Sequence, residues 1–105
     1  MEITAQELSM ALSSGQKLRL VDVREPEEWQ VCHLAGALLI PLSEFPVRAP
    51  AELKEDASIV IYCHHGMRSA RAQHFLISKG FSDVKNLRGG IDAWSSQVDP
   101  QMPRY

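Results

Sequence analysis

The stretch that decides the fold is residues 58–69, which read Ser58-Ile59-Val60-Ile61-Tyr62-Cys63-His64-His65-Gly66-Met67-Arg68-Ser69. Its first five residues are mostly β-branched or aromatic, as in a buried strand. Cys63 follows the strand directly, and Ser69 can cap a helix that begins just beyond. A thiolate at this position faces the unpaired N–H groups of a short loop and the positive end of a helix. We therefore expect Cys63 to be a nucleophile.

Composition limits the class of protein. A chain of 105 residues with 45% apolar and 23% charged residues is typical of one globular domain, here residues 1–105. The net charge of −2 argues against a broad nucleic-acid-binding surface. No apolar run is long enough to span a membrane, and Met1-Glu2-Ile3-Thr4 does not resemble a signal peptide. We expect a cytoplasmic protein without nucleic-acid or membrane partners.

Helix and strand signals alternate along the chain. The capping-box pattern from Thr4 to Glu7 begins one helix, and Pro26 suits the first turn of another. The patterns predict helices over residues 5–14, 26–31, 69–79 and 90–94, strands over 17–23, 37–40, 58–62 and 81–87, and short helical turns over 41–57. This alternation predicts an α/β fold, a parallel sheet with helices on both faces.

Ligands bind such sheets at the carboxyl ends of the strands, and three candidate residues fall there. Cys63 follows one strand, while Asp22 and Arg24 lie at the end of another. His64, His65, Arg68 and Arg71 gather basic groups around the one candidate nucleophile of a slightly acidic chain. The pattern favours a small anion as ligand.

Four separate segments fall in the order of one family. They are Val21-Asp22-Val23-Arg24-Glu25 with Glu28-Trp29, then His33-Leu34-Ala35-Gly36-Ala37 leading to Ile40-Pro41-Leu42, then Tyr62 to Ser69, and last Leu87-Arg88-Gly89-Gly90-Ile91-Asp92-Ala93-Trp94. In this combination the chain resembles the rhodanese family of sulfurtransferases in its single-domain form. One position differs, because the residue before His33 is usually glycine in that family and is Cys32 here.

The resemblance implies a three-layer α/β/α fold with a five-stranded parallel sheet and an active-site loop from Cys63 to Arg68. By this resemblance, Cys63 is expected to take a sulfane sulfur from a donor and to hold it as a persulfide. The resemblance also implies that the other residues of the site, His64, His65, Gly66, Met67, Arg68 and Ser69, form an anion cradle. It implies that Asp22 and Arg24 are supporting ion-pair partners. No cofactor is expected.

Physical chemistry gives the loop residues distinct roles. Gly66 can take a positive φ at little cost, which turns successive amides towards the sulfur. Arg68 offers a fixed positive charge to a dianionic donor such as thiosulfate, and His64 and His65 add donors if they face the pocket. The acceptor would be cyanide, a low-molecular-weight thiol or a thioredoxin-like protein.

Three other functions stay open. A cysteine-dependent phosphatase or arsenate reductase needs five residues between Cys and Arg, whereas four separate Cys63 from Arg68. A catalytically silent binding module would keep the fold without the chemistry. A persulfide carrier would pass sulfur from Cys63 to a protein partner in tRNA thiolation or cofactor assembly.

Two further expectations concern a possible metal site and the second cysteine. We expect no metal at His64 and His65, because adjacent side chains diverge and no third ligand is evident. Cys32 is expected to be a small, partly buried apolar residue rather than a resolving thiol.

Overall fold

Five parallel strands form one sheet in the computed structural model, which describes all 105 residues. The strands are β1 (Glu2–Ile3), β2 (Arg19–Asp22), β3 (Leu38–Leu39), β4 (Ile59–Tyr62) and β5 (Val84–Leu87). They lie side by side in the order β1-β5-β4-β2-β3, and every neighbouring pair is parallel. The expected α/β fold with a five-stranded parallel sheet is confirmed.

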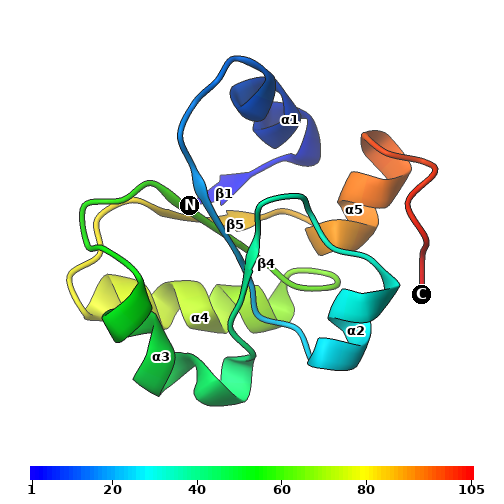
Figure 1. The fold of residues 1–105 in the computed structure, drawn as a ribbon. Helices are drawn as coiled ribbons and strands as arrows, with labels where there is room; N and C mark the ends of the chain where they lie inside the picture. The colour runs from blue at the N-terminus through cyan, green and yellow to red at the C-terminus, as the bar shows by residue number, and fades with distance from the viewer.

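Helices cover both faces of the sheet (Figure 1). On one face lie α3 (Phe45–Glu52) and α4 (Met67–Ser78), together with the short 3₁₀ helix η1 (Leu42–Glu44). On the other face lie α1 (Ala5–Ser13) and α5 (Gly90–Gln97). The remaining helix, α2 (Pro26–Val31), follows β2. No helix is both long and apolar enough to cross a lipid bilayer.

The alternation of side chains along the strands explains this layering. Ile59 and Ile61 of β4 enter the apolar cluster beneath α3 and α4, whereas Val60 and Tyr62 enter the cluster beneath α1 and α5. All four residues of β4 are buried. A strand buried on both faces reads as a continuous apolar run, as residues 59–62 do.

Two elements differ from the sequence-based expectation. The edge strand β1 is missing from the prediction, because two residues are too few to show any periodicity. Residues 45–52 form a full helix rather than isolated turns, although they contain two prolines. Pro46 lies in the first turn, where its missing N–H is not needed, and Pro50 is accommodated within the helix.

The prediction that Ser69 caps a helix is wrong. Helix α4 begins two residues earlier, at Met67, and its N-cap is Gly66. Ser69 is fully buried within the first turn. Its hydroxyl is therefore turned towards the interior of the site, where it has partners of its own.

The parallel sheet brings three chain segments to one edge. Strands β2, β4 and β5 are neighbours, and their carboxyl ends lead into Arg24, Cys63 and Gly89 respectively. Because parallel strands share one direction, these segments meet at the same edge of the sheet. Segments separated by more than sixty residues thus form one site.

A pair of neighbouring substitutions tests this core. Leu76 on α4 is fully buried, whereas the next residue, Ile77, is 47% exposed. Leu76→Ala should lower the free energy of unfolding by about 2–5 kcal/mol because it leaves a cavity. Ile77→Ala should cost less than about 1 kcal/mol. Urea unfolding of both variants measures the difference, and equal losses would contradict the burial of Leu76.

Candidate active site

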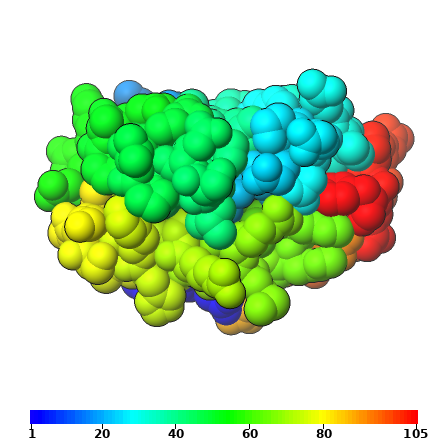
Figure 2. Space-filling view, turned by 90° about the horizontal axis from the view of Figure 1, so that it is seen from below, coloured from blue at the N-terminus to red at the C-terminus, as the bar shows by residue number.

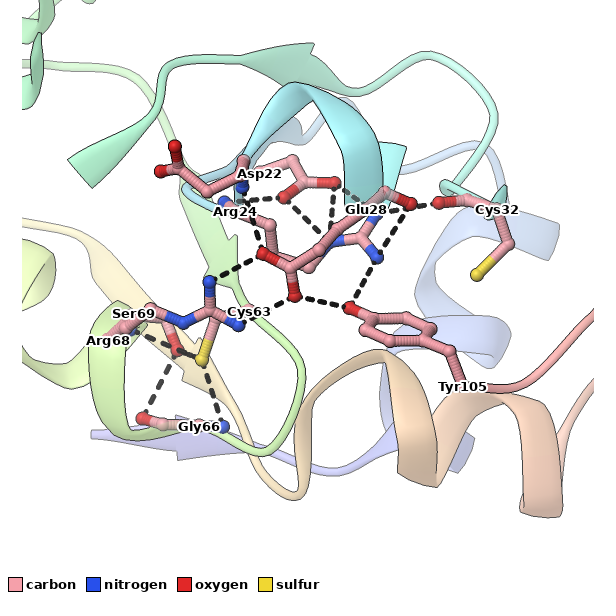
Figure 3. Close-up of polar contacts among 10 residues, drawn as sticks. Asp22, Arg24, Glu28, Cys32, Cys63, Gly66, Arg68, Ser69 and Tyr105 are labelled. Atoms are coloured by element: carbon pink, nitrogen blue, oxygen red, sulfur yellow. Dashed lines mark hydrogen bonds and ion pairs between the residues drawn. The ribbon is translucent and has the colours of Figure 1, made fainter. Parts of the chain in front are cut away.

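The sulfur of Cys63 lies inside the loop and accepts hydrogen bonds from the backbone (Figure 3). Cys63 is only 1% exposed. Its Sγ is 3.0 Å from the N–H nitrogen of Gly66 and 3.4 Å from that of Ser69. The Ser69 Oγ lies 3.3 Å from the same sulfur. Backbone N–H groups directed at a sulfur stabilise negative charge on it.

The backbone of Gly66 makes this cradle possible. Its φ of +114° confirms the predicted positive angle. An added Cβ would have only ordinary contacts, the nearest at 3.8 Å, so the requirement for glycine comes from the backbone angle. The N–H groups of His65, Met67 and Arg68 donate to no acceptor within the protein. These groups remain available to a second sulfur or to an anion.

Asn86 is a site residue that sequence reasoning missed. It is buried on β5, and its Oδ1 accepts from the Ser69 hydroxyl at 2.5 Å. Its Nδ2 donates to the Gly66 carbonyl at 3.0 Å. Since a hydroxyl has one proton, the short distance directs that of Ser69 to Asn86, and backbone N–H groups are left as the main donors to Cys63. The available signal was an uncharged polar residue beside Leu87, near the carboxyl end of a predicted strand.

The first turn of α5 is hydrogen-bonded to the backbone of the loop that begins at Cys63. The N–H of Ile91 donates to the Cys63 carbonyl at 2.9 Å, and that of Asp92 donates to the His64 carbonyl at 3.1 Å. A Cβ on Gly90 would lie 2.3 Å from the His64 oxygen and 2.5 Å from the Cys63 oxygen. Only glycine lets the two backbones approach this closely, which explains Gly90 at the start of α5.

Asp22 and Arg24 form the ion pair that the sequence predicts, and both are fully buried. The Arg24 Nη2 donates to the Asp22 Oδ2 at 2.6 Å, and the Arg24 Nε donates to Oδ1 at 2.9 Å. Arg24 also donates to the Cys32 carbonyl at 2.7 Å. The pair thereby ties the end of β2 to the end of α2.

Arg68 is paired with Glu28, a residue that the sequence does not single out as part of the site. Its Nη1 and Nη2 donate to the two carboxylate oxygens at 2.6 and 2.9 Å (Figure 3). These bonds, with smaller contributions from a backbone N–H and from Tyr105, hold the pKa of Glu28 at about 2 against the effect of burial. The sequence predicts that Arg68 offers its positive charge to a dianionic donor, but this charge is already neutralised by Glu28.

Tyr105 is the third residue that the prediction missed. Its hydroxyl accepts from Arg24 at 2.8 Å and donates to Glu28 at 2.8 Å. Burial, opposed by Arg24 and supported by Glu28, raises the pKa of this hydroxyl to about 12. The C-terminal segment that carries it lies against α2 and beside the loop (Figure 2). No local pattern near residue 105 indicates such a contact.

The remaining loop side chains take different positions. The imidazole of His64 stacks against the imidazole of His65 and against the phenol ring of Tyr105, with ring centroids 4.0 Å apart in each pair. Burial and the neighbouring His65 lower the pKa of His64, so this ring is neutral at pH 7. His65 is exposed, and Met67 is 78% exposed. Met67 therefore contributes to the cradle through its backbone.

The expectation that the two adjacent histidines diverge is wrong. Their rings stack, and Asp92 supplies a third ligand atom, all three atoms lying within 4.8 Å of one another. The Asp92 carboxylate already accepts from the Arg104 guanidinium at 2.7 Å. The cluster is thus partly occupied by an ion pair within the protein.

Cys32 fits its position without strain. Its φ of −166° is extended backbone that any residue adopts, so the glycine expected there is not required. The side chain packs in the apolar cluster beneath α1 and α5, whereas Cys63 belongs to the opposite cluster. Both cysteines are free. The packing agrees with a small, apolar role for Cys32.

Comparison with known proteins identifies the family. Residues 4–97 match the rhodanese-like domain, and the chain belongs to this family. It is 46% identical over 104 residues to the probable adenylyltransferase/sulfurtransferase MoeZ of Mycobacterium tuberculosis. The match covers 98% of this chain but only 26% of MoeZ, so the chain spans about a quarter of that relative.

Two similar proteins are matched over most of their length. A sulfurtransferase of Allochromatium vinosum is 39% identical over 94 residues, which cover 90% of this chain and 87% of that protein. The structure of the human single-domain sulfurtransferase TSTD1 superposes with a TM-score of 0.80 at 29% identity, over 91% of this chain and 96% of that one. The chain is thus a rhodanese-like domain, and both of these similar proteins are named sulfurtransferases.

Two glycine-to-alanine substitutions distinguish the effect of a steric clash with the loop from the effect of a positive φ angle. Gly90 and Gly36 both have positive φ, +63° and +79°, but space around Gly36 is open. Gly90→Ala should destabilise the protein by about 1–3 kcal/mol more than Gly36→Ala, because its Cβ meets loop carbonyls. It should also change the alkylation rate of Cys63, read by peptide mass spectrometry. Equal behaviour of the two variants would contradict the packing of α5 on the loop.

The Glu28 ion pair predicts a pH-dependent stability. A glutamate in the unfolded chain titrates near about pH 4.3, above the folded pKa of about 2. The stabilisation is therefore complete above about pH 4.3 and is lost as the pH falls towards about 2. Glu28→Gln should be less stable than wild type at about pH 6, and the gap should narrow by about pH 2.5. A gap that stays constant in denaturant titrations would contradict this pairing.

Proposed function

We propose that the protein transfers a sulfane sulfur from thiosulfate or a similar donor to a thiophilic acceptor through a persulfide on Cys63. The observation that carries this proposal is the buried sulfur of Cys63, which accepts from the backbone N–H groups of Gly66 and Ser69. Membership of the rhodanese-like family supports it. Two free cysteines suit a reducing compartment such as the cytoplasm.

The first half of the cycle loads the sulfur. The Cys63 thiolate attacks the sulfane sulfur of thiosulfate, a new S–S bond forms, and the S–S bond of the donor breaks. Sulfite leaves with the electron pair of that bond. The product is a Cys63 persulfide whose outer sulfur carries the negative charge. Total charge is conserved, and neither an oxidant nor a reductant is needed.

The second half removes the sulfur. Cyanide attacks the outer sulfur and leaves as thiocyanate, which returns Cys63 as a thiolate. A low-molecular-weight thiol would instead take the sulfur as its own persulfide. A thioredoxin-like dithiol would release it as sulfide while its two thiols are oxidised to a disulfide. This ping-pong order needs no dedicated general base, because the nucleophile and both leaving groups are anions.

The loop residues have separate roles in this cycle. Gly66 and Ser69 direct N–H groups at the sulfur, and the unpaired N–H groups of His65, Met67 and Arg68 can hold the second sulfur. Developing charge is thus met by donors that are oriented before reaction. Asp22 and Arg24 act at a distance, by fixing the segments around the loop.

A persulfide carrier is the second candidate function. The 46% identical segment of MoeZ belongs to a longer protein whose name combines an adenylyltransferase with a sulfurtransferase. By analogy, Cys63 would receive sulfur from one protein and deliver it to another. Both functions use the same persulfide and differ in the acceptor.

Mass spectrometry tests the shared intermediate. After treatment with thiosulfate, the Cys63 peptide should gain one sulfur atom, and cyanide should remove it. Cys63→Ser should abolish the gain and the turnover, whereas Cys32→Ser should retain both. Sulfur found on Cys32, or a wild-type protein that takes no sulfur from any donor, would contradict the proposed function.

A further inference from the structure

The two arginines that take part in the site, Arg68 and Arg24, are each paired with a carboxylate. Arg68 donates to both oxygens of Glu28, in the bidentate geometry that gives the strongest pairs. Arg24 is paired with Asp22 in the same way. His64 contributes no charge at pH 7. Together with their paired carboxylates, Arg68 and Arg24 therefore add no net positive charge to the site.

Glu28 is also fixed independently of Arg68. Its Oε1 accepts from the Glu25 N–H at 3.0 Å, and its Oε2 accepts from the Tyr105 hydroxyl at 2.8 Å. Each carboxylate oxygen thus has a second donor, from α2 itself or from the C-terminal segment. A sulfur-donating anion that binds Arg68 therefore does not displace Glu28, because these two hydrogen bonds hold the Glu28 carboxylate next to Arg68.

An incoming anion consequently meets Glu28 as well as Arg68. Repulsion by a fixed carboxylate grows with the charge of the donor, so a dianion is disfavoured about twice as strongly as a monoanion in free energy. The unpaired N–H groups of the loop attract either kind of anion, and they can hold a single negative charge without help from Arg68.

We propose that Glu28 is a specificity-determining residue that shifts the donor preference of the site from doubly charged towards singly charged sulfane-sulfur compounds. The inference rests on the proposed function and narrows its substrate class. Thiosulfate remains a donor but an inefficient one. Persulfides and thiosulfonates, each with one negative charge, are the preferred class.

Donors of different charge provide the test. The ratio kcat/KM is measured for thiosulfate, which is doubly charged, and for benzenethiosulfonate, which is singly charged, with cyanide as acceptor. Glu28→Gln should raise the value for thiosulfate by about three- to tenfold and that for benzenethiosulfonate by about two- to threefold. The change should shrink as sodium chloride is added, because salt screens the repulsion.

Two variants on the same helix serve as controls. Glu27 is exposed, so Glu27→Gln changes the net charge equally but should leave the preference between donors unchanged. Glu28→Asp retains the charge and should retain the wild-type preference. Glutamine at position 28 can still accept from the Glu25 N–H, which keeps the capping box and the fold.

A binding measurement gives an answer that does not depend on turnover. Thiosulfate should bind the Cys63→Ser/Glu28→Gln protein about three- to tenfold more tightly than the Cys63→Ser protein, as measured by NMR titration. An unchanged affinity, or a loss of kcat/KM for thiosulfate in Glu28→Gln, would overturn the role of Glu28. Failure of the wild-type protein to accept sulfur from either donor would instead count against the proposed function, while the titration would still decide the charge preference.

Discussion

Two backbone hydrogen bonds from α5 to the loop determine the rest of the site. The N–H groups of Ile91 and Asp92 bind the carbonyls of Cys63 and His64 and so hold these peptide groups in one orientation. Because the C=O and N–H of a trans peptide point in opposite directions, the N–H groups of His64 and His65 point away from α5. Gly90 permits this contact because it has no side chain to separate the two backbones. The cradle is therefore a property of the backbone, set by a helix far away in sequence.

A chain of hydrogen-bonded polar side chains leads to the loop. It runs from Asp22 through Arg24 and Tyr105 to Glu28 and ends at Arg68 (Figure 3). The buried end gives the chain its rigidity, because an unpaired charge there would be costly. The outer end lies beside the loop, where an anion must enter. Structural support and donor selection are thus two functions of one network.

The sequence predicts the parts of this site that depend on local chemistry. Cys63 at a strand end and Gly66 in a short loop have consequences that follow from position alone, and the structure contains both features. Glu28 and Tyr105 are different, because their partners lie 40 and 81 residues away along the chain. Such contacts arise only when the sheet brings distant segments to one edge. Strand β1 was missed for a similar reason, since its two residues are defined only by pairing with β5.

The central claim is that the loop N–H groups hold a sulfur delivered to Cys63. The most direct test follows the amide resonances of the ¹⁵N-labelled protein by NMR while a sulfane-sulfur donor and then cyanide are added. The account predicts that the amide signals of residues 65–69 shift when the donor is added and return when cyanide is added. Loop signals that stay unchanged on addition of the donor, in a protein that nevertheless carries the extra sulfur, would contradict it.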